Sequence, residues 1–233
     1  MNVSRLVASV GSYFYSTGAD TLAVHLYGGN SASLNIGGRR VSVTERSDYP
    51  WSGTIRVAID PEEAVEFSVR LRIPGWAHGA TARVNGKAID VSANLAHGYL
   101  DIRRRWQKGD AIDLELPMPV ERLYANPNVR MDVGRVALKR GPLVYCAEQV
   151  DNARPVPRLR LPRDAKVAAH PRRDLFDGIV TLVADGEAVS DDWRDDLYRS
   201  APPAGARATV TALPYFLWNN REPGAMAIWI PEA

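Results

Sequence analysis

Four histidines are the first candidates for catalysis or metal binding in this chain of 233 residues. They are His25, His78, His97 and His170, far apart in the sequence. A zinc site or a catalytic triad needs groups that converge, and no pair of these histidines has a His-x-x-x-His or His-x-Glu spacing. We therefore expect no histidine-based site. His25, in a strand-like segment, is the best placed of the four to reach the rim of a sheet.

Cys146 is the single cysteine, which excludes an internal disulfide framework and a multi-cysteine metal site. It stands in an apolar, strand-like run without an adjacent base. We expect a small buried side chain rather than a nucleophile.

The densest acidic cluster is Asp191-Asp192-Trp193-Arg194-Asp195-Asp196. It lacks the alternate carboxylates and the central glycine of an EF-hand calcium loop, so a solvated surface loop held by Trp193 is favoured. A glycosidase needs two carboxylates facing each other across roughly 5 to 10 Å, which local spacing does not reveal. No nucleophile elbow, phosphate loop or dinucleotide fingerprint occurs. The residues alone thus indicate no catalytic, cofactor-binding or metal site.

Aromatic residues beside predicted turns give a different candidate. Tyr49, Trp51 and Trp76 lie in such places, and exposed rings near the loops of a β-sandwich can stack against sugars. The alternative is that each ring closes one end of the core, which is favoured for Trp106. For the first three, contact with sugar or with a neighbouring domain stays open.

The elements that would position these residues are almost all strands. Residues 2–15 are the exception, because Val3, Leu6, Val7, Val10 and Phe14 recur at helical spacing and Asn2 can cap the helix. From Thr21 the period changes to two. The predicted strands of this half are 21–27, 33–36, 40–46, 53–59, 64–73, 81–84, 98–102 and 110–116. Asn85-Gly86 predicts a tight hairpin between 82–84 and 87–89.

The second half follows a break at Pro117-Met118-Pro119. Its predicted strands are 120–124, 129–132, 136–139, 143–149, 179–184, 209–212 and 226–230. Gly141-Pro142 predicts a hinge between the two central strands. Segments 151–174 and 185–207 are expected to be surface loops. The chain is predicted to be all-β, with a terminal helix at 1–17 and two consecutive jelly-roll-like β-sandwich domains at 18–118 and 119–233.

Composition narrows the class of protein. The formal net charge is +2 and the basic residues are scattered, so no nucleic-acid footprint is present. No apolar run reaches the roughly 18 residues of a membrane span, and the N-terminus lacks a signal-peptide pattern. We expect a soluble, cytoplasmic protein without nucleic-acid or membrane partners.

Beyond these patterns, the sequence resembles the C-terminal part of glycoside hydrolase family 127, typified by β-L-arabinofuranosidase. The segments that carry the resemblance are, in order, Asn2-Val3-Ser4-Arg5-Leu6-Val7-Ala8-Ser9, Leu22-Ala23-Val24-His25-Leu26-Tyr27, Asp48-Tyr49-Pro50-Trp51-Ser52-Gly53, Leu71-Arg72-Ile73-Pro74-Gly75-Trp76, Val84-Asn85-Gly86, Gly98-Tyr99-Leu100, Trp106 with Gly109-Asp110, Leu116-Pro117-Met118-Pro119, Gly141-Pro142-Leu143-Val144-Tyr145-Cys146, Pro214-Tyr215 with Trp218, and Ala227-Ile228-Trp229-Ile230.

The resemblance implies an enzyme with a catalytic α/α barrel followed by two β-sandwich domains. It also implies a zinc ion in the barrel, held by a glutamate and cysteines, one of which is the nucleophile of a retaining mechanism. Of the family's Cys-Cys-Pro-Pro-Asn motif only Asn2 is present, and Cys146 matches a different position. The catalytic and metal-binding residues therefore carry over to no position here, and zinc is expected only in the barrel.

Two functions follow from these observations. In the first, the chain is the non-catalytic accessory region of a family 127-like glycosidase, inactive alone, with the last barrel helix at its start and the barrel as its partner. In the second, it is a free-standing module that binds carbohydrate, with arabinose-containing glycans as the candidate ligands, or another partner. Tyr49, Trp51 and Trp76 are the candidate contact residues in both.

Overall fold

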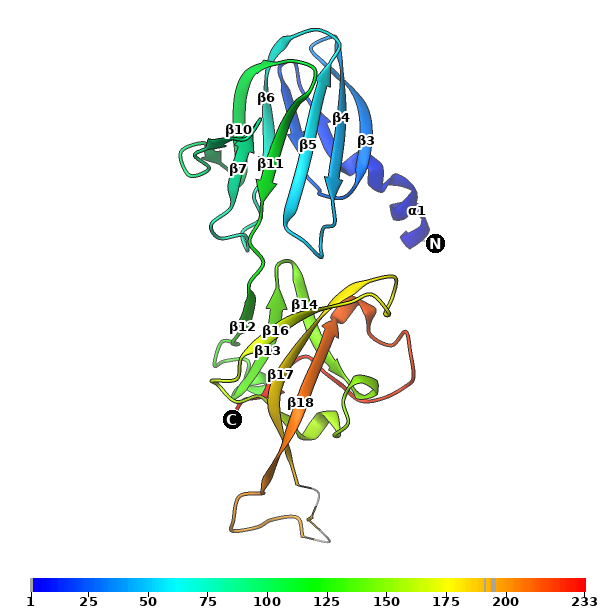
Figure 1. Cartoon of the computed structure of the whole chain (residues 1–233). Coiled ribbons are helices and arrows are strands. Elements are labelled where there is room, and N and C mark those ends of the chain that lie inside the picture. The colour runs from blue at the N-terminus through cyan, green and yellow to red at the C-terminus, as the bar shows by residue number, and fades with distance from the viewer. Residues whose placement is uncertain (1, 191, 194–195) are drawn as a thin grey trace. The chain divides into compact units, whose positions relative to one another are not determined.

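The computed structural model describes residues 2–190, 192–193 and 196–233. The chain folds into two compact units, Met1–Met118 and Pro119–Ala233, and strands dominate both (Figure 1). The all-β class predicted from sequence is confirmed, with several sheets arranged in sandwich-like domains after one N-terminal helix. No helix in the described part of the chain has the length and apolar character needed to cross a membrane.

Unit 1 is a sandwich of two sheets. The first has the order β1-β2-β6-β10-β9, with β1 Tyr15–Thr17, β2 Thr21–Val24, β6 Val65–Arg72, β10 Tyr99–Trp106 and β9 Leu95–Ala96. The second has the order β3-β4-β5-β11-β7-β8, with β3 Asn30–Ile36, β4 Arg39–Ser47, β5 Thr54–Pro61, β11 Asp110–Glu115, β7 Thr81–Val84 and β8 Lys87–Ile89. In β5 alternate residues point inward, and both sheets contribute to one core.

Trp106 is the largest side chain of that core. It is fully buried and tilts against Phe67, with ring centroids 6.0 Å apart. Its indole N–H donates to the carbonyl of Phe67 at 3.0 Å, which satisfies the polar atom inside an apolar core. The prediction that Trp106 belongs to the core is confirmed.

The Asn85-Gly86 hairpin is also confirmed. β7 and β8 pair through Ala82↔Ile89 and Val84↔Lys87, in the predicted register. Asn85 and Gly86 have φ values of 50° and 79°, the left-handed conformation that a two-residue hairpin turn requires and that these two residue types adopt readily.

The N-terminal helix is shorter than predicted. Helix α1 spans Asn2–Ser9, a 3-10 turn covers Val10–Tyr13, and the chain then enters β1, where a helix had been expected to residue 15. Pairing of Tyr15 with Val24 removes the last residues from the helix, because strand β1 takes up their backbone hydrogen bonds. None of the residues of α1 is buried.

Unit 2 is one curved network of strands around a second core. The order is β12-β13-β14-β18-β17-β15, with β12 Val120–Leu123, β13 Arg135–Arg140, β14 Leu143–Glu148, β18 Gly205–Pro214, β17 Ile179–Val189 and β15 Leu159–Arg160. Beside this path, β16 (Val167–Arg172) pairs β17, β19 (Met226–Ala227) pairs β14 and β20 (Ile230–Pro231) pairs β13. Short 3-10 turns lie at Arg130–Asp132, Gln149–Asp151, Val156–Arg158 and Tyr215–Leu217.

The hinge at Gly141-Pro142 joins β13 and β14 as predicted. Tyr145 and Ala147 face the core and Cys146 is buried on the opposite side of the strand, so the expected place of the cysteine is confirmed.

Four predictions in unit 2 were wrong. The segment 226–230, predicted as one strand, holds the short strand β19 and the start of β20, which pair with different strands. The segment 129–132 is not a strand, and Arg130–Asp132 form a 3-10 turn. Segment 151–174 contains β15, β16 and the buried core residues Val156, Leu159 and Leu161, so it is not simply a surface loop. Segment 185–207 begins and ends in strand, because β17 and β18 continue as a long paired ribbon to Val189↔Gly205. Of the acidic run 191–196, Asp191, Arg194 and Asp195 lie outside the described residues.

Candidate functional site

Two of the three predicted contact residues meet at one end of unit 1. The rings of Tyr49 and Trp76 stack with centroids 6.4 Å apart and an interplanar angle of 25°. Tyr27 meets Tyr49 edge-on at 6.1 Å. Tyr49 and Trp76 are half-buried and pack against the core, so part of each ring is structural. Their contact with sugar or with a partner stays a prediction.

Trp51 belongs to the same loop as Tyr49 but is not among the aromatic side chains that pack against the core of unit 1. Its backbone N–H donates to the carbonyl of Asp48 at 2.8 Å, which closes a turn before β5. The side chain is half-buried, and its role in docking also stays a prediction.

His25 is the centre of a polar cluster on this unit. Its Nδ1 lies 2.7 Å from the hydroxyl of Tyr99, and its Nε2 lies 2.8 Å from the hydroxyl of Ser16. Its backbone N–H donates to the carbonyl of Phe14 at 2.8 Å. Both ring nitrogens therefore have hydroxyl partners, and the described part of the chain shows no second histidine hydrogen-bonded to this one.

The sheet order explains how these residues come together. His25 follows β2 directly, Arg72 ends β6 and Tyr99 begins β10, and these three strands are neighbours. Val24 pairs with Leu71, and Arg72 pairs with Tyr99, so the three residues stand at one level of the sheet. Sequence reasoning singled out His25 but missed Arg72 and Tyr99, because only the strand register places them beside it.

Two adjoining hollows lie over this row, and both are lined by His25, Leu26 and Arg72. The first, of about 420 Å³, also contacts Ser12, Tyr13, Tyr15, Ser16 and Tyr99. The second, of about 180 Å³, also contacts Val10, Phe14, Tyr27, Tyr49 and Pro74. We call the two together the Arg72 hollow. Because Val10 and Tyr13 belong to the turn after α1, the hollow continues from the helix.

A buried carboxyl group lies near this site without lining it. Glu45 is 2% exposed, its Oε1 accepts the backbone N–H of Gly28 at 2.6 Å, and its Oε2 has no hydrogen-bond partner in the structure. Burial raises the pKa of Glu45 to about 7. Burial, and secondly the charge of Glu45, raises the pKa of Tyr15 to about 12. The walls of the hollow thus present hydroxyls, a guanidinium and an imidazole, which suit binding of an anion better than proton transfer.

Zinc does not fit the residues that the structure describes. Among the described residues, no group of three or more His, Cys, Asp and Glu side chains is arranged to hold a metal ion. Burial raises the pKa of the Cys146 thiol to about 12, and the nearby charges of Glu148 and Asp151 act in the same direction. A thiolate is the form that binds metal or attacks substrate, so no catalytic step is assigned to Cys146.

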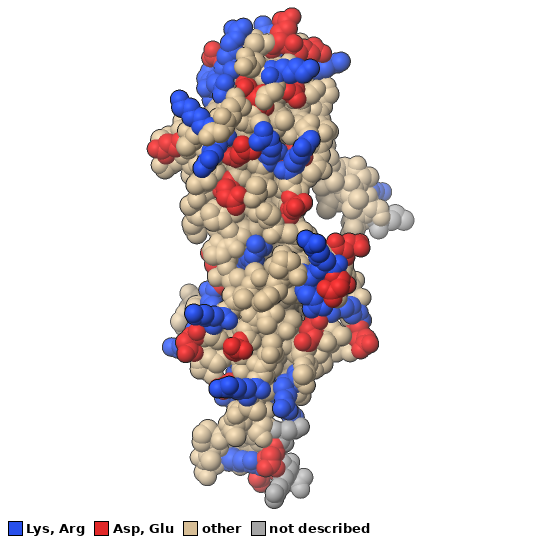
Figure 2. Space-filling view, in the orientation of Figure 1, with Lys and Arg blue, Asp and Glu red and all other residues tan. Residues whose placement is uncertain are grey.

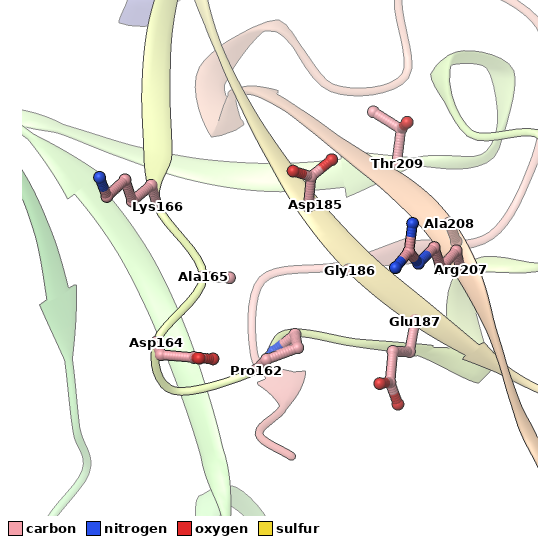
Figure 3. Close-up of a pocket in the computed structure, with 10 residues that line it drawn as sticks. All are labelled: Pro162, Asp164, Ala165, Lys166, Asp185, Gly186, Glu187, Arg207, Ala208 and Thr209. Carbon is pink, nitrogen blue, oxygen red and sulfur yellow. The ribbon is translucent and has the colours of Figure 1, made fainter.

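A larger hollow than these lies on the surface of unit 2 (Figure 3). It measures about 640 Å³ and lies over β17 and β18, with Asp185 and Glu187 from the first strand and Arg207 and Thr209 from the second. Asp164 and Lys166 come from the loop before β16. No described aromatic side chain lines it, so it provides no stacking surface for a sugar ring.

The comparisons with known proteins agree with the fold. The model of the β-L-arabinofuranosidase GH127 middle domain matches residues 21–118, and that of the glycoside hydrolase family 127 C-terminal domain matches residues 120–231. A non-reducing end β-L-arabinofuranosidase of Bifidobacterium longum subsp. longum is 40% identical over 98% of this chain, which covers 36% of that protein.

Solved structures give the same picture. A GH127 β-L-arabinofuranosidase from Geobacillus stearothermophilus T6 superposes with a TM-score of 0.95 at 45% identity, over 100% of this chain and 37% of its own. A GH127 β-arabinofuranosidase superposes with a TM-score of 0.90 at 31% identity, over 100% of this chain and 38% of its own. The chain thus spans a little over a third of the length of these relatives. It belongs to glycoside hydrolase family 127, and it comprises the middle and C-terminal domains of that family.

Proposed function

We propose that this chain is the non-catalytic C-terminal accessory region of a family 127 glycosidase, with β-L-arabinofuranosidase as the activity of the whole enzyme. Its partner is a catalytic α/α barrel that carries the zinc and the nucleophilic cysteine. The relatives support this, since each is nearly three times as long as the part that this chain matches.

The observation that carries the proposal is the uncovered apolar face of α1 and of the turn that follows it. Val3 is 74% exposed, Leu6 58%, Val7 67% and Val10 41%. Figure 2 shows the helix as a mostly uncharged projection from unit 1. Burying an aliphatic side chain of this size is worth roughly 1.5 to 3 kcal/mol, so a partner that covers three of them contributes about 4 to 9 kcal/mol. Such a face is typical of a docking surface.

A chimera tests the proposal. The residues of the Geobacillus relative that precede its matching region are joined to Asn2 of this chain, which gives a protein of natural length. We expect the chimera to release arabinose from an aryl β-L-arabinofuranoside and to hold zinc, and the 233-residue chain alone to do neither. Turnover by the isolated chain, lost on Cys146→Ala, would contradict the proposal.

A free-standing carbohydrate module is the second candidate. Unit 1 carries the stacked pair Tyr49 and Trp76, and unit 2 carries a second pair, Tyr215 and Trp218. The ring centroids of the second pair lie 6.2 Å apart at an interplanar angle of only 9°, and these residues are 43% and 39% exposed. Exposed parallel rings favour stacking with sugars. A glycan array separates the two functions, because a module of this kind binds arabinose-containing glycans in the absence of any barrel and loses them on Trp218→Ala or Trp76→Ala.

A further inference from the structure

Arg72 differs from its neighbour on the same face of β6. Two residues earlier, Arg70 stands opposite Asp101 of β10, and its Nε donates to the carboxylate at 2.8 Å. Arg72 stands opposite Tyr99, where the ladder offers a phenol in place of a carboxylate. In the part of the chain that the structure describes, no carboxylate lies within ion-pair distance of the Arg72 guanidinium.

The rest of the Arg72 hollow leaves this positive charge uncompensated. Its lining, given above, contains no Asp or Glu. The charge of Glu45 acts on two wall residues, Tyr15 and Tyr27, but Glu45 is buried, and burial raises its pKa to about 7, so part of its population is neutral at pH 7. The hollow is thus cationic, with tyrosine hydroxyls around the charge.

The position of the hollow couples this charge to the apolar helix. Val10 and Phe14 line the same hollow as Arg72, so a partner that covers the C-terminal end of the helical segment also covers the guanidinium. Removing an unpaired guanidinium from water is unfavourable by several kcal/mol, and a carboxylate offsets that loss through two parallel hydrogen bonds. For a purely apolar partner, the unfavourable desolvation of Arg72 would offset much of the binding free energy gained by burying Val10.

We infer that the Arg72 hollow receives an aspartate or glutamate side chain of the catalytic domain, which pairs with the Arg72 guanidinium. The inference rests on the proposed function and deepens it, because it states the chemistry of the partner's contact. A second copy of this chain is a poorer occupant. The surface formed by α1 and the hollow carries positive charge and no acidic residue, so the same surface on a second copy has no carboxylate to pair with Arg72.

Zero-length cross-linking in the chimera tests the pair directly. Arg72→Lys keeps the positive charge and adds a primary amine, which a carbodiimide couples only to a carboxylate in contact with it. We expect mass spectrometry to find an amide between position 72 and an acidic residue that precedes Asn2. Arg39→Lys is the matched control, because Arg39 is also exposed but lies on the other sheet, in β4.

Hydrogen exchange of α1 in the same chimera keeps the two proposals apart. Protected α1 amides would show that the barrel docks. If position 72 then gives no cross-link, or gives links only to carboxylates of residues 2–233 of the same or a second copy, the acidic contact is overturned while barrel docking stands. Unprotected α1 amides would refute docking itself, and the acidic contact with it. With docking present, Arg72→Glu should reduce α1 protection on the order of tenfold while Arg39→Glu leaves it unchanged.

Discussion

Glu45 gives a stability prediction for a single residue. Its pKa is raised by burial from 4.5 to about 7, so between these pH values the folded protein holds a proton that the unfolded chain releases. The contribution of Glu45 to stability is therefore fully present below about pH 4.5 and is lost as the pH rises towards 7. Glu45→Gln keeps an oxygen that accepts the Gly28 N–H. Because the amide does not ionise, the variant avoids the loss of stability that the wild type suffers as the pH rises. We expect the variant to gain roughly 3 kcal/mol over the wild type at pH 8.

Chemical unfolding of the isolated chain at pH 4, 6 and 8 measures the effect. Glu63→Gln is the control, since Glu63 is exposed. If the difference in the free energy of unfolding between Glu45→Gln and the wild type is the same at all three pH values, Glu45 is not a buried acid that titrates in this range.

Arg221 gives the corresponding prediction for unit 2. Its guanidinium donates to Glu148 at 2.6 Å and to Asp151 at 2.8 Å, and these carboxylate side chains are only 4% and 11% exposed. Arg221→Ala leaves two buried negative charges without their cation, so we expect a loss of about 3 to 5 kcal/mol in the free energy of unfolding of unit 2.

The exposed pair Arg172–Asp174 supplies the comparison for this variant, because its side chains are 39% and 65% exposed. Arg172→Ala should change the stability by at most about 1 kcal/mol. Denaturant unfolding followed by tryptophan fluorescence measures both, and similar losses for the two variants would show that burial does not set the strength of the Arg221 cluster.

What could be predicted at the residue scale depended on local pattern. Cys146 and Trp106 were correctly predicted to be buried, because each stands in a strand whose alternation is visible in the sequence. Arg72 was not recognised as part of a candidate site. Its meaning comes from the contrast between Tyr99 and Asp101 across the ladder, which is a property of pairing between strands about thirty residues apart.

At the scale of elements, two loops of unit 1 each carry a tryptophan: Trp51 lies between β4 and β5, and Trp76 lies between β6 and β7. Trp76 stacks on Tyr49 and packs against the core, and Trp51 is half-buried in the loop before β5. We expect Trp51→Ala to lower the melting temperature of this chain less than Trp76→Ala does, since truncating an aromatic side chain that packs against the core costs about 3 kcal/mol or more.

In the chimera, Trp51→Ala should instead reduce activity or stability if this loop faces the barrel. Calorimetry of both variants in both proteins tests this. Unfolding of the isolated chain by Trp51→Ala would assign that side chain to the core and remove it from the candidate interface.

Elements with strong alternation or defined turn chemistry could be predicted, such as the Asn85-Gly86 hairpin and the strands on either side of Gly141-Pro142. β16 was missed because its segment contains Pro171 and polar residues and is mostly exposed, so it pairs along β17 without an apolar face of its own. The outer half of β17 was missed because Gly186 interrupts the pattern. An added Cβ there would lie 2.8 Å from the carbonyl of Arg160, so close packing of the chain requires the glycine.

At the scale of the whole molecule, the order of family-like segments along the chain gave the family, which the comparisons confirm. The surface that joins this region to a larger enzyme could be predicted only in part. The apolar face of α1 is a periodic feature of one segment, whereas the Arg72 hollow is assembled from the helical turn and three strands. Long-range assembly of this kind leaves no pattern in any single stretch of sequence.

The last prediction concerns α1 in the isolated chain. A helix of eight residues is marginal in water, and the four apolar side chains of this helical segment have no cover here. We expect its amides to exchange nearly as fast as in an unfolded peptide, while those of Leu143 to Tyr145 in β14 are protected by orders of magnitude. In the chimera the α1 amides should become protected, because the barrel covers the apolar face.

Truncation gives the complementary measurement. Deleting residues 1–12 should leave both units folded and improve solubility, since an exposed apolar face promotes association. The cut stops there because Tyr15–Thr17 pairs with β2 and Tyr15 packs against the core, so removing β1 would destabilise unit 1. If α1 in the monomeric chain is as protected as β14, the helix already has its partner within these 233 residues, and the main physical argument for a docked barrel fails.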